Sequence, residues 1–475
     1  MIHTLLIIIQ IINIITVLYM ILREDRSPYS IISWTLILYL APAIGFVLFL
    51  LLGRRIGNSN MFGIKDAELK VLESHIIDER ESLRQNTELK NSDMIRFISE
   101  IGYFPYREGV DINLYSHGEY FFGELLKCIR EAKHSINIQF YIFKNDDIGS
   151  KILNELEKKA KDGVEVRLLY DSVGSRSLNK KVLNNIINAG GKVGEFFSSW
   201  LKLININMNF RNHRKIVVID NTIGFVGGFN VGDEYLGKNK KFGYWRDTHI
   251  KIKGSAVHDL NLRFLADWRY ATKEDISLDS ILEYPDDIST SENGVQIISS
   301  GPNLENTYEI KLAYLKMIQR AKKYVYIQSP YLILDRSIID SLKISALSGV
   351  DVKIMIPGKG DHPFVYWANL FYAGDLIKSG VKVYHYDENA FLHAKTVVID
   401  DKICSIGTAN MDTRSFELNF EINALLYSKD ISKKQREAFE NDLLNSKELT
   451  LNDYNNRSLS IKVKESFSRL FSNVL

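Results

Sequence analysis

The chain has 475 residues, which is too long for one ordinary domain and predicts two or three. Hydrophobic residues make up 45% of it and charged residues 25%, so we expect packed cores rather than disorder. A formal net charge of +2 does not favour a general polyanion binder. The two cysteines, Cys128 and Cys404, are too few for a disulfide framework or a cysteine zinc site.

Two uncharged stretches at the N-terminus, 4–22 and 31–52, are each long enough to cross the hydrocarbon core of a bilayer as a helix. Trp34 stands near the start of the second stretch, where an amphipathic ring suits the membrane interface. We therefore expect a hairpin of two transmembrane helices over residues 1–55. A cleaved signal peptide is the alternative for the first stretch, although a basic leading segment and a small-x-small cleavage site are both missing.

The basic residues around these stretches predict the orientation of the hairpin. The short loop between the stretches carries Arg23 and Arg26, whereas the segment after the second stretch is richer in basic residues and begins with Arg54 and Arg55. Because Lys and Arg favour the cytoplasmic side of a membrane, we expect the main body of the chain in the cytoplasm.

Beyond a polar connector at 56–100, the chain alternates strand and helix patterns. Alternating apolar residues at 135–143 predict a strand, and an apolar helical stripe follows at 148–161. A second strand pattern at 164–170 completes a β-α-β unit. The same order recurs at residues 324–328, 338–346 and 350–356.

This internal repeat is too long for a solenoid. It predicts an α/β fold of two homologous lobes, the first at 101–290 and the second at 291–475. We expect each lobe to contain a mostly parallel sheet that helices bury on both faces.

Two matching motifs carry the chemistry. Residues 213–230 read HRKIVVIDNTIGFVGGFN, and residues 393–410 read HAKTVVIDDKICSIGTAN. A single H-x-K-x-x-x-x-D pattern is a weak signal. Two copies, each on a Val-Val-Ile strand and each followed at the same distance by Gly and Asn, strongly indicate a paired site. The less favoured interpretation is a duplicated structural strand whose His and Lys are surface residues.

The spacing of the motifs has a geometric consequence. Residues two apart on a strand share one face, so His213 points with Lys215, and His393 points with Lys395. If the lobes pack about a pseudo-two-fold axis, these four side chains converge on one site. Such a site suits a phosphate diester, because Lys stabilises the non-bridging oxygens while one His attacks phosphorus and the other protonates the leaving oxygen. No carboxylate cluster suggests a metal, so we expect neither a metal nor a cofactor.

The paired motifs resemble those of the phospholipase D superfamily, and the resemblance covers nearly the whole chain. The segments 26–28, 211–212 and 300–303 (RSP, RN and SGPN) are similar to those of the two-span bacterial cardiolipin synthases. The resemblance implies two phospholipase-D-like lobes behind a membrane hairpin, in the cell membrane of a bacterium. It also implies that phosphatidylglycerol is both donor and acceptor, giving cardiolipin and glycerol through a phosphohistidine intermediate.

The resemblance assigns roles to the motif residues. His213 is expected to be the nucleophile, and His393 the general acid and then the general base. This order is the less secure part, because the motifs are nearly symmetric. Lys215 and Lys395 match the positions at which the family binds phosphate.

Four further motif residues match the family pattern. Asn230 and Asn410 match phosphate-binding positions, and Asp220 and Asp400 match the motif aspartates. Strand spacing puts both aspartates at or past a strand end, so we interpret these two as structural.

Each catalytic His needs an acceptor that orients its other ring nitrogen. The family places a carboxylate some thirty residues downstream, which indicates Asp247 for His213 and Glu421 for His393. Two alternatives stay open, namely that Asp247 only pairs with a base and that Glu417 takes the place of Glu421.

The motifs diverge after the Gly that both copies share, Gly227 in the first and Gly407 in the second. The first continues with Gly228, whereas the second continues with Thr408, whose hydroxyl can donate a hydrogen bond. The two halves are therefore not equivalent, which suits a division between nucleophile and acid.

Three segments suggest contact with lipid, each with a plain alternative. The aromatic-rich stretches 196–210 and 364–372 either meet acyl chains or pack in a core. The basic loop at 238–241 either faces anionic headgroups or is simply solvated.

Four functions compete on this sequence. A membrane phosphatidyltransferase and a phospholipase D that uses water as acceptor fit the motifs equally well. The uncharged hairpin and the near-neutral charge argue against a nuclease, so we expect no nucleic-acid partner. The intact His and Lys pairs argue against a non-catalytic membrane scaffold. The sequence does not indicate an oligomeric state.

Overall fold

The structure is a computed structural model. It describes residues 2–23, 28–53, 92–102, 104–197, 210–274, 276, 291–302 and 307–470. Most of the expected connector at 56–100 lies outside these residues, and its described end forms helix α5 (Ser92–Ile101).

The N-terminal segment folds into consecutive helices: α1 (Ile2–Arg23), α2 (Pro28–Leu40), α3 (Pro42–Leu48) and the π-helix η1 (Phe49–Gly53). The second predicted stretch is interrupted at Ala41, because Pro42 has no N–H to continue the helical bonding. The Asn13 side chain donates to the carbonyls of Leu38 and Pro42, at 3.1 and 3.2 Å, and so ties α1 to the break.

The two membrane spans expected from the sequence are not supported by these helices. Across the described parts of the chain, no helix combines the length with the apolar character that crossing a membrane takes.

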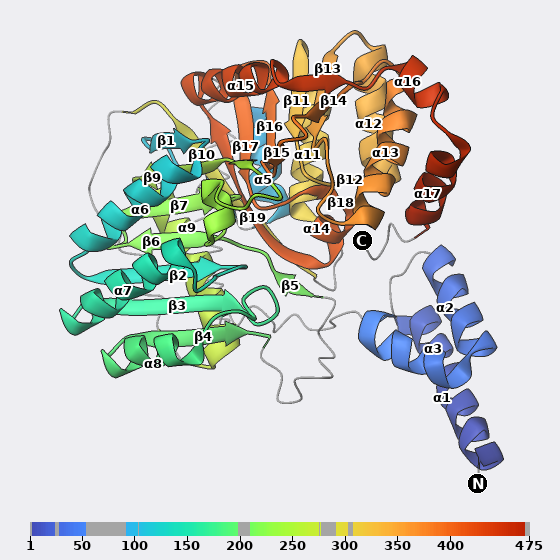
Figure 1. Cartoon of the computed structure of the whole chain (residues 1–475), viewed down its shortest axis with the longest axis horizontal. Coiled ribbons are helices and arrows are strands. Elements are labelled where there is room, and N and C mark those ends of the chain that lie inside the picture. The colour runs from blue at the N-terminus through green and yellow to red at the C-terminus, as the bar shows by residue number, and fades with distance from the viewer. Residues whose placement is uncertain are drawn as a thin grey trace.

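The body consists of two lobes, each built on one sheet (Figure 1). The first sheet has the strand order β1-β9-β7-β6-β2-β3-β4. Its strands are β1 (Asp111–Tyr115), β2 (Ser135–Phe140), β3 (Glu165–Asp171), β4 (Lys192–Phe196), β6 (Ile216–Ile219), β7 (Ile223–Gly227) and β9 (His249–Lys253).

Helices cover both faces of the first sheet. Three pack their apolar stripes on one face and share one core with it: α6 (Gly118–Glu131), α7 (Asp147–Lys161) and α8 (Lys180–Asn188). Helix α9 (Ala256–Thr272) packs on the opposite face, in a core that continues into the second lobe.

The second sheet repeats this plan in the order β10-β19-β17-β16-β11-β13-β14-β20. Its strands are β10 (Gly294–Ser300), β11 (Tyr324–Gln328), β13 (Asp351–Ile356), β14 (Lys382–Tyr386), β16 (Thr396–Ile399), β17 (Ile403–Gly407), β19 (Asn419–Tyr427) and β20 (Ser446–Glu448). Its main helices are α11 (Glu309–Arg320), α12 (Arg336–Leu347), α13 (Pro363–Ile377) and α15 (Lys429–Leu443).

The predicted repeat is confirmed, since β2-α7-β3 and β11-α12-β13 are equivalent β-α-β units. The prediction of mostly parallel sheets is wrong. Within each sheet path, only β2-β3-β4 and β11-β13-β14 are parallel, and the other neighbours run antiparallel.

The reason for the mixed sheets is the tight turn that follows each motif strand. Asp220 and Asn221 have φ of 51° and 53°, and Asp400 and Asp401 have φ of 54° and 52°. Positive φ at both central residues defines a turn that folds a strand directly back into a hairpin. The β6-β7 and β16-β17 pairs are therefore antiparallel, with no room for a crossover helix.

The two sheets face each other across one shared apolar core. It joins Val226 and Ile250 of the first sheet to Ile406 and Ile422 of the second. Since this core removes apolar surface of both lobes from water, it holds the lobes in a fixed orientation.

The structure describes the two aromatic-rich stretches, 196–210 and 364–372, to different extents. Residues 198–209 lie outside the described residues, while Phe196 and Phe197 pack in the shared core against Phe420. The stretch 364–372 belongs to α13, where Val365 and Ala368 are buried and Phe364 is exposed.

Candidate active site

The His and Lys of each motif lie immediately before a motif strand rather than within it. His213 and Lys215 connect β5 (Arg211–Asn212) to β6, and His393 and Lys395 connect β15 (Ala390–Leu392) to β16. The ammonium of Lys215 donates to the carbonyl of His213 at 2.7 Å, and that of Lys395 to the carbonyl of His393 at 2.5 Å. In the second motif the Lys395 ammonium also lies 2.9 Å from Nδ1 of His393, so these two side chains contact each other.

The site lies where the two lobes exchange short strands. Strand β5 of the first lobe runs parallel to the start of β19, and the His213 N–H donates to the Phe420 carbonyl at 2.9 Å. Strand β15 of the second lobe runs parallel to β8 (Tyr244–Arg246), and the His393 N–H donates to the Arg246 carbonyl at 2.7 Å. Each His is thus held beside a strand of the other lobe.

This exchange decides which carboxylate orients which His. Nδ1 of His213 lies 2.9 and 3.1 Å from the carboxylate oxygens of Glu421, and Nδ1 of His393 lies 2.6 Å from Oδ2 of Asp247. Both predicted carboxylates hold a His, but the predicted pairing within each lobe is wrong. The partners are crossed, because the neighbouring strand of each His comes from the opposite lobe.

Burial sets the protonation of the site. All four motif residues are at most 9% exposed. Burial is the largest cause that lowers the pKa of both His213 and His393 to about 4. The next largest effects differ, because the Glu421 charge raises the pKa of His213 whereas the Lys395 charge lowers that of His393 further.

Burial and neighbouring charges also shift the pKa values of the carboxylates and lysines of the site. Burial alone raises the pKa of Glu421 and Asp247, but the attraction of His213 and of Lys395 outweighs it and lowers both pKa values. Burial lowers the pKa of Lys215 to about 7 and that of Lys395 to about 8. At neutral pH the site therefore contains two carboxylates, two neutral imidazoles, a largely protonated Lys395 and a Lys215 near the midpoint of its titration.

The crossed contacts bring the two motifs to the same join between the lobes, because each His contacts a carboxylate of the opposite lobe. The charges of Lys215 and Lys395 each lower the pKa of the His in the other motif as well as that of their own. Convergence of all four side chains on one phosphate stays a prediction.

Aromatic rings flank the two imidazoles. The ring of Tyr141 lies 5.0 Å from that of His213, and the ring of Trp245 lies 5.2 Å from that of His393. The ammonium of Lys215 lies 5.6 Å from the centre of the Tyr141 ring. Tyr141 lies within the strand predicted at 135–143 and directly follows the observed β2, but its place beside the site had no signal in the sequence.

Arg214 is a further residue that the motif analysis missed. Its side chain is fully buried, and Nη1 pairs with both oxygens of Asp267 at 2.6 and 2.8 Å. Nε donates to the Glu421 carbonyl at 3.1 Å, and Nη2 donates to the Ser300 carbonyl at 3.0 Å. Arg214 therefore anchors the carboxylate-bearing strand of the second lobe to the first. The one available signal is its position between His213 and Lys215, where the second motif has Ala394.

The difference after each motif Gly has a steric cause. A Cβ on Gly228 would lie 1.9 Å from Oδ1 of Asp247, so no larger residue fits beside this carboxylate. On the other side, Thr408 is accommodated next to Glu421, and its hydroxyl exchanges hydrogen bonds with the backbone of Ile422 at 2.9 and 3.2 Å. The two halves therefore differ after the motif Gly, as predicted. The difference lies beside the carboxylates, with Gly228 next to Asp247 and Thr408 next to Glu421.

The structure gives the motif aspartates a role in the fold. The Asp220 carboxylate accepts the backbone N–H groups of residues 133–135, and that of Asp400 accepts those of residues 322–324. Each aspartate thus fixes the start of the neighbouring strand, in agreement with the structural interpretation.

The motif asparagines are placed differently in the two lobes. Oδ1 of Asn230 accepts the Ile142 N–H at 3.0 Å, and Nδ2 donates to the Tyr235 hydroxyl at 2.9 Å. Oδ1 of Asn410 is buried and has no hydrogen-bond partner among the described residues. A role for either in holding phosphate stays a prediction.

Among the described residues, no group of three or more His, Cys, Asp or Glu side chains is arranged to hold a metal ion.

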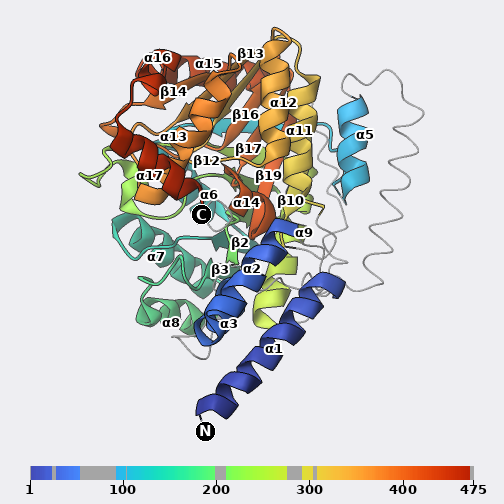
Figure 2. The same ribbon diagram turned by 90° about the vertical axis from the view of Figure 1, so that its right-hand side faces the viewer.

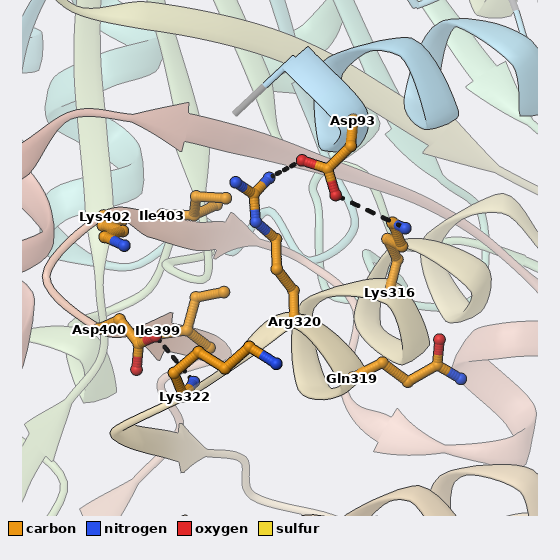
Figure 3. Close-up of a pocket in the computed structure, with 9 residues that line it drawn as sticks. All are labelled: Asp93, Lys316, Gln319, Arg320, Lys322, Ile399, Asp400, Lys402 and Ile403. Carbon is orange, nitrogen blue, oxygen red and sulfur yellow. Dashed lines mark hydrogen bonds and ion pairs between the residues drawn. The ribbon is translucent and has the colours of Figure 1, made fainter. Parts of the chain in front are cut away.

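A separate cavity of about 520 Å³ lies at the outer end of the second lobe (Figure 3). It is lined by Lys316, Arg320 and Lys402, among others, and Asp93 pairs with the first two. This cavity contains neither motif His, so it is distinct from the paired site.

The fold and the site define a class of protein. Two mixed α/β lobes joined at paired His and Lys side chains are the arrangement of the phospholipase D superfamily. The solved structure of a phosphatidylserine synthase from Haemophilus influenzae has the same fold, with a TM-score of 0.61 over 81% of this chain and 100% of that chain, at 16% identity. A polyphosphate kinase from Porphyromonas gingivalis matches 75% of this chain and 53% of that chain, with a TM-score of 0.50 and 12% identity.

Family profiles and relatives narrow the class. Residues 125–268 and 314–443 match the family described as "Cardiolipin synthase, PLD-like domain", and residues 11–54 match "Phospholipase_D-nuclease N-terminal". The chain is 52% identical to a cardiolipin synthase of Staphylococcus aureus strain N315, covering 98% of this chain and 95% of that one. It is 45% identical to the major cardiolipin synthase of Bacillus subtilis strain 168, covering 98% of each. The chain belongs to the cardiolipin synthase family.

Proposed function

We propose that this chain transfers a phosphatidyl group from one phosphatidylglycerol molecule to another, giving cardiolipin and releasing glycerol. The observation that carries the proposal is the pair of His–carboxylate contacts, His213 with Glu421 and His393 with Asp247. Each carboxylate accepts the Nδ1 proton of its imidazole. The Nε2 atoms are thereby left free for chemistry at phosphorus.

In the first half of the reaction, Nε2 of His213 attacks the phosphorus of the donor lipid. The phosphorus–oxygen bond to the headgroup glycerol breaks. His393 acts here as the imidazolium, protonated at both ring nitrogens, a form that the bound anionic phosphate favours, and it gives its Nε2 proton to the departing oxygen. Lys215 and Lys395 stabilise the charge that builds on the non-bridging oxygens. Glycerol leaves, and the phosphatidyl group stays on His213.

In the second half, His393 takes the proton from a terminal hydroxyl of the acceptor phosphatidylglycerol. The resulting oxygen attacks phosphorus, the phosphorus–nitrogen bond to His213 breaks, and cardiolipin leaves. The pKa of each imidazole is lowered to about 4, and each is raised by its own carboxylate and lowered by both lysines, so this division of roles rests on the family resemblance.

The proposal is tested by incubating the purified chain with vesicles of phosphatidylglycerol and identifying the products. We expect cardiolipin and glycerol. In the His213→Ala variant no phosphatidyl adduct should be trapped, whereas in His393→Ala an adduct on His213 should form slowly and persist. An adduct on His393 in an active enzyme would reverse the two roles.

Hydrolysis by water as acceptor is the second function that the motifs allow. The same two half-reactions then release phosphatidic acid and glycerol. A product mixture dominated by phosphatidic acid would replace the transferase proposal with a phospholipase D activity.

We further propose that the N-terminal helices anchor the chain to the cytoplasmic face of a bacterial cell membrane as a two-helix hairpin. The uncharged stretches 4–22 and 31–52 support this proposal, as do the bonds from Asn13 that satisfy carbonyls around Pro42. Residues 101–290 and 291–475 are then the two catalytic lobes. Phosphatidylglycerol is the only partner required.

A chain shortened to begin near residue 56 should keep turnover on detergent-dispersed lipid, because every motif side chain lies beyond that point. It should lose activity on intact vesicles, where the full chain is active. Turnover of both chains on both substrates, with thermal unfolding as a check on folding, measures the effect. A folded but inactive shortened chain would show that the helices do more than anchor.

Binding of a phosphate diester should be linked to proton uptake. The empty-site pKa of Lys215 is about 7 and that of Lys395 about 8, and an anionic ligand favours the protonated form of both. The affinity of the site for the phosphate diester should therefore be highest below about pH 7, where both lysines are protonated before the ligand binds. It declines as pH rises through 7 and 8, by up to about tenfold per pH unit for each lysine.

Titration calorimetry with a water-soluble phosphate diester measures this linkage. Buffers of different ionisation enthalpy report the number of protons taken up. An affinity that stays flat between pH 6 and 9 with no proton uptake would show that both lysines are already charged in the empty site.

A further inference from the structure

Helix α17 (Leu459–Arg469), near the end of the described chain, is docked on the body with its polar side inward. Glu465 and Ser468 are buried, at 1% and 2% exposure, and Ile461 is half-buried beside them. These positions are spaced by four and three residues, so they form one face of the helix. The side that meets the protein is thus mostly polar.

The contacts beneath this face are charged and aromatic. Glu465 pairs with Arg457 at 2.8 Å. The Lys464 ammonium lies 4.9 Å from the centre of the Trp367 ring of α13, and the Arg469 guanidinium lies 4.5 Å from the Phe371 ring. Such cation–ring contacts are attractive. They fix which side of α17 faces the body.

The opposite side of α17 presents apolar residues to the outside. Leu459, Val463, Phe467 and Leu470 are 77%, 59%, 53% and 71% exposed. Steps of four, four and three residues place them on one continuous stripe. An amphipathic helix of a water-soluble body normally turns this stripe toward the core, so the orientation of α17 is the reverse of the usual one.

Charge and position indicate what covers the stripe. Lys462 and Lys464 are exposed and flank it on either side. Basic residues beside an apolar stripe are typical of helices that lie in the interface of an anionic bilayer. Helix α17 also lies on the same side of the molecule as α1–α3, which is the right-hand side of Figure 1 and faces the viewer in Figure 2.

We propose that α17 is an interfacial helix that rests on the surface of an anionic phospholipid bilayer. Its apolar stripe enters the acyl boundary and Lys462 contacts the lipid phosphates, while Lys464 keeps its contact with the Trp367 ring. Together with the N-terminal hairpin it gives the body a second point of contact, which limits how the lobes can rotate above the membrane. This binding does not depend on the proposed reaction.

The test places an environment-sensitive fluorophore on the stripe of the full chain. The two native cysteines, Cys128 and Cys404, are buried, so a Val463→Cys variant can be labelled selectively. The matched control is Tyr120→Cys, because Tyr120 is 67% exposed and its helix α6 lies on the opposite side of the molecule in Figure 1. Both variants are reconstituted at one copy per nanodisc, in phosphatidylglycerol mixed with phosphatidylcholine.

The expected result is a shift of the label at 463 to shorter emission wavelength, together with quenching by brominated acyl chains, while the label at 120 shows neither. In nanodiscs of phosphatidylcholine alone, or with Lys462→Glu added, the quenching at 463 should fall. A label at 463 as solvent-exposed as that at 120 would overturn the proposal. If the label at 463 were shielded from solvent only when several copies share one disc, the stripe would be covered by a second copy of this chain and the bilayer proposal would be overturned.

Discussion

Replacing Glu421 with Gln should lower turnover by about 10⁴-fold, the effect known for the carboxylate that orients a catalytic His. The amide keeps the size of the side chain but cannot hold the Nδ1 proton of His213 in the same way. Since Glu421 contacts His213 in the structure, the loss should fall on the first half of the reaction. Rapid-quench trapping of the phosphatidyl adduct on His213 measures it.

Two variants serve as comparisons for Glu421→Gln. Asp247→Asn should instead let the adduct form slowly and then persist, because Asp247 contacts His393, which serves both half-reactions. Glu417→Gln, four residues upstream on the short helix α14 (Thr413–Glu417), should change turnover little. The crossed arrangement would be contradicted if Asp247→Asn abolished the adduct while Glu421→Gln left its formation unchanged.

Removal of either motif lysine should also be severe. Lys215→Ala and Lys395→Ala should each lower turnover roughly 10²–10³-fold, since each ammonium stabilises charge that builds on the phosphoryl oxygens. The Arg variants keep the charge, but the planar guanidinium is too large for a buried site shaped to an ammonium. They should lose most activity while binding of phosphatidylglycerol changes much less.

The matched control for the lysines is Lys238→Ala. Lys238 pairs with Asp147 at 2.7 Å on the exposed surface, so its loss should leave turnover unchanged and cost little stability. Turnover and thermal unfolding are measured for all variants, because Lys215 and Lys395 are buried and their truncation also removes packing. A folded Lys395→Ala or Lys215→Ala enzyme with near-normal turnover would show that one lysine suffices at the phosphate.

The sequence by itself determined the parts of this protein that depend on short-range spacing. Apolar periodicity is local, so the β-α-β units around 135–170 and 324–356 could be placed before the structure was known. The same holds for the motif residues, because the H-x-K spacing that occurs twice is itself a short-range pattern. Duplication of the motif then predicted that two such pairs meet.

Only the tertiary structure decided how the halves are joined. Asp247 and Glu421 lie at similar distances behind their own motifs, so chain spacing favoured pairing within each lobe. The observed pairing depends instead on β5 lying beside β19 and β15 lying beside β8. The same is true of Arg214, whose partners Asp267 and the Glu421 carbonyl are far away in the chain. Contacts of this kind depend on how whole sheets pack together, and the pattern of neighbouring residues carries no information about that packing.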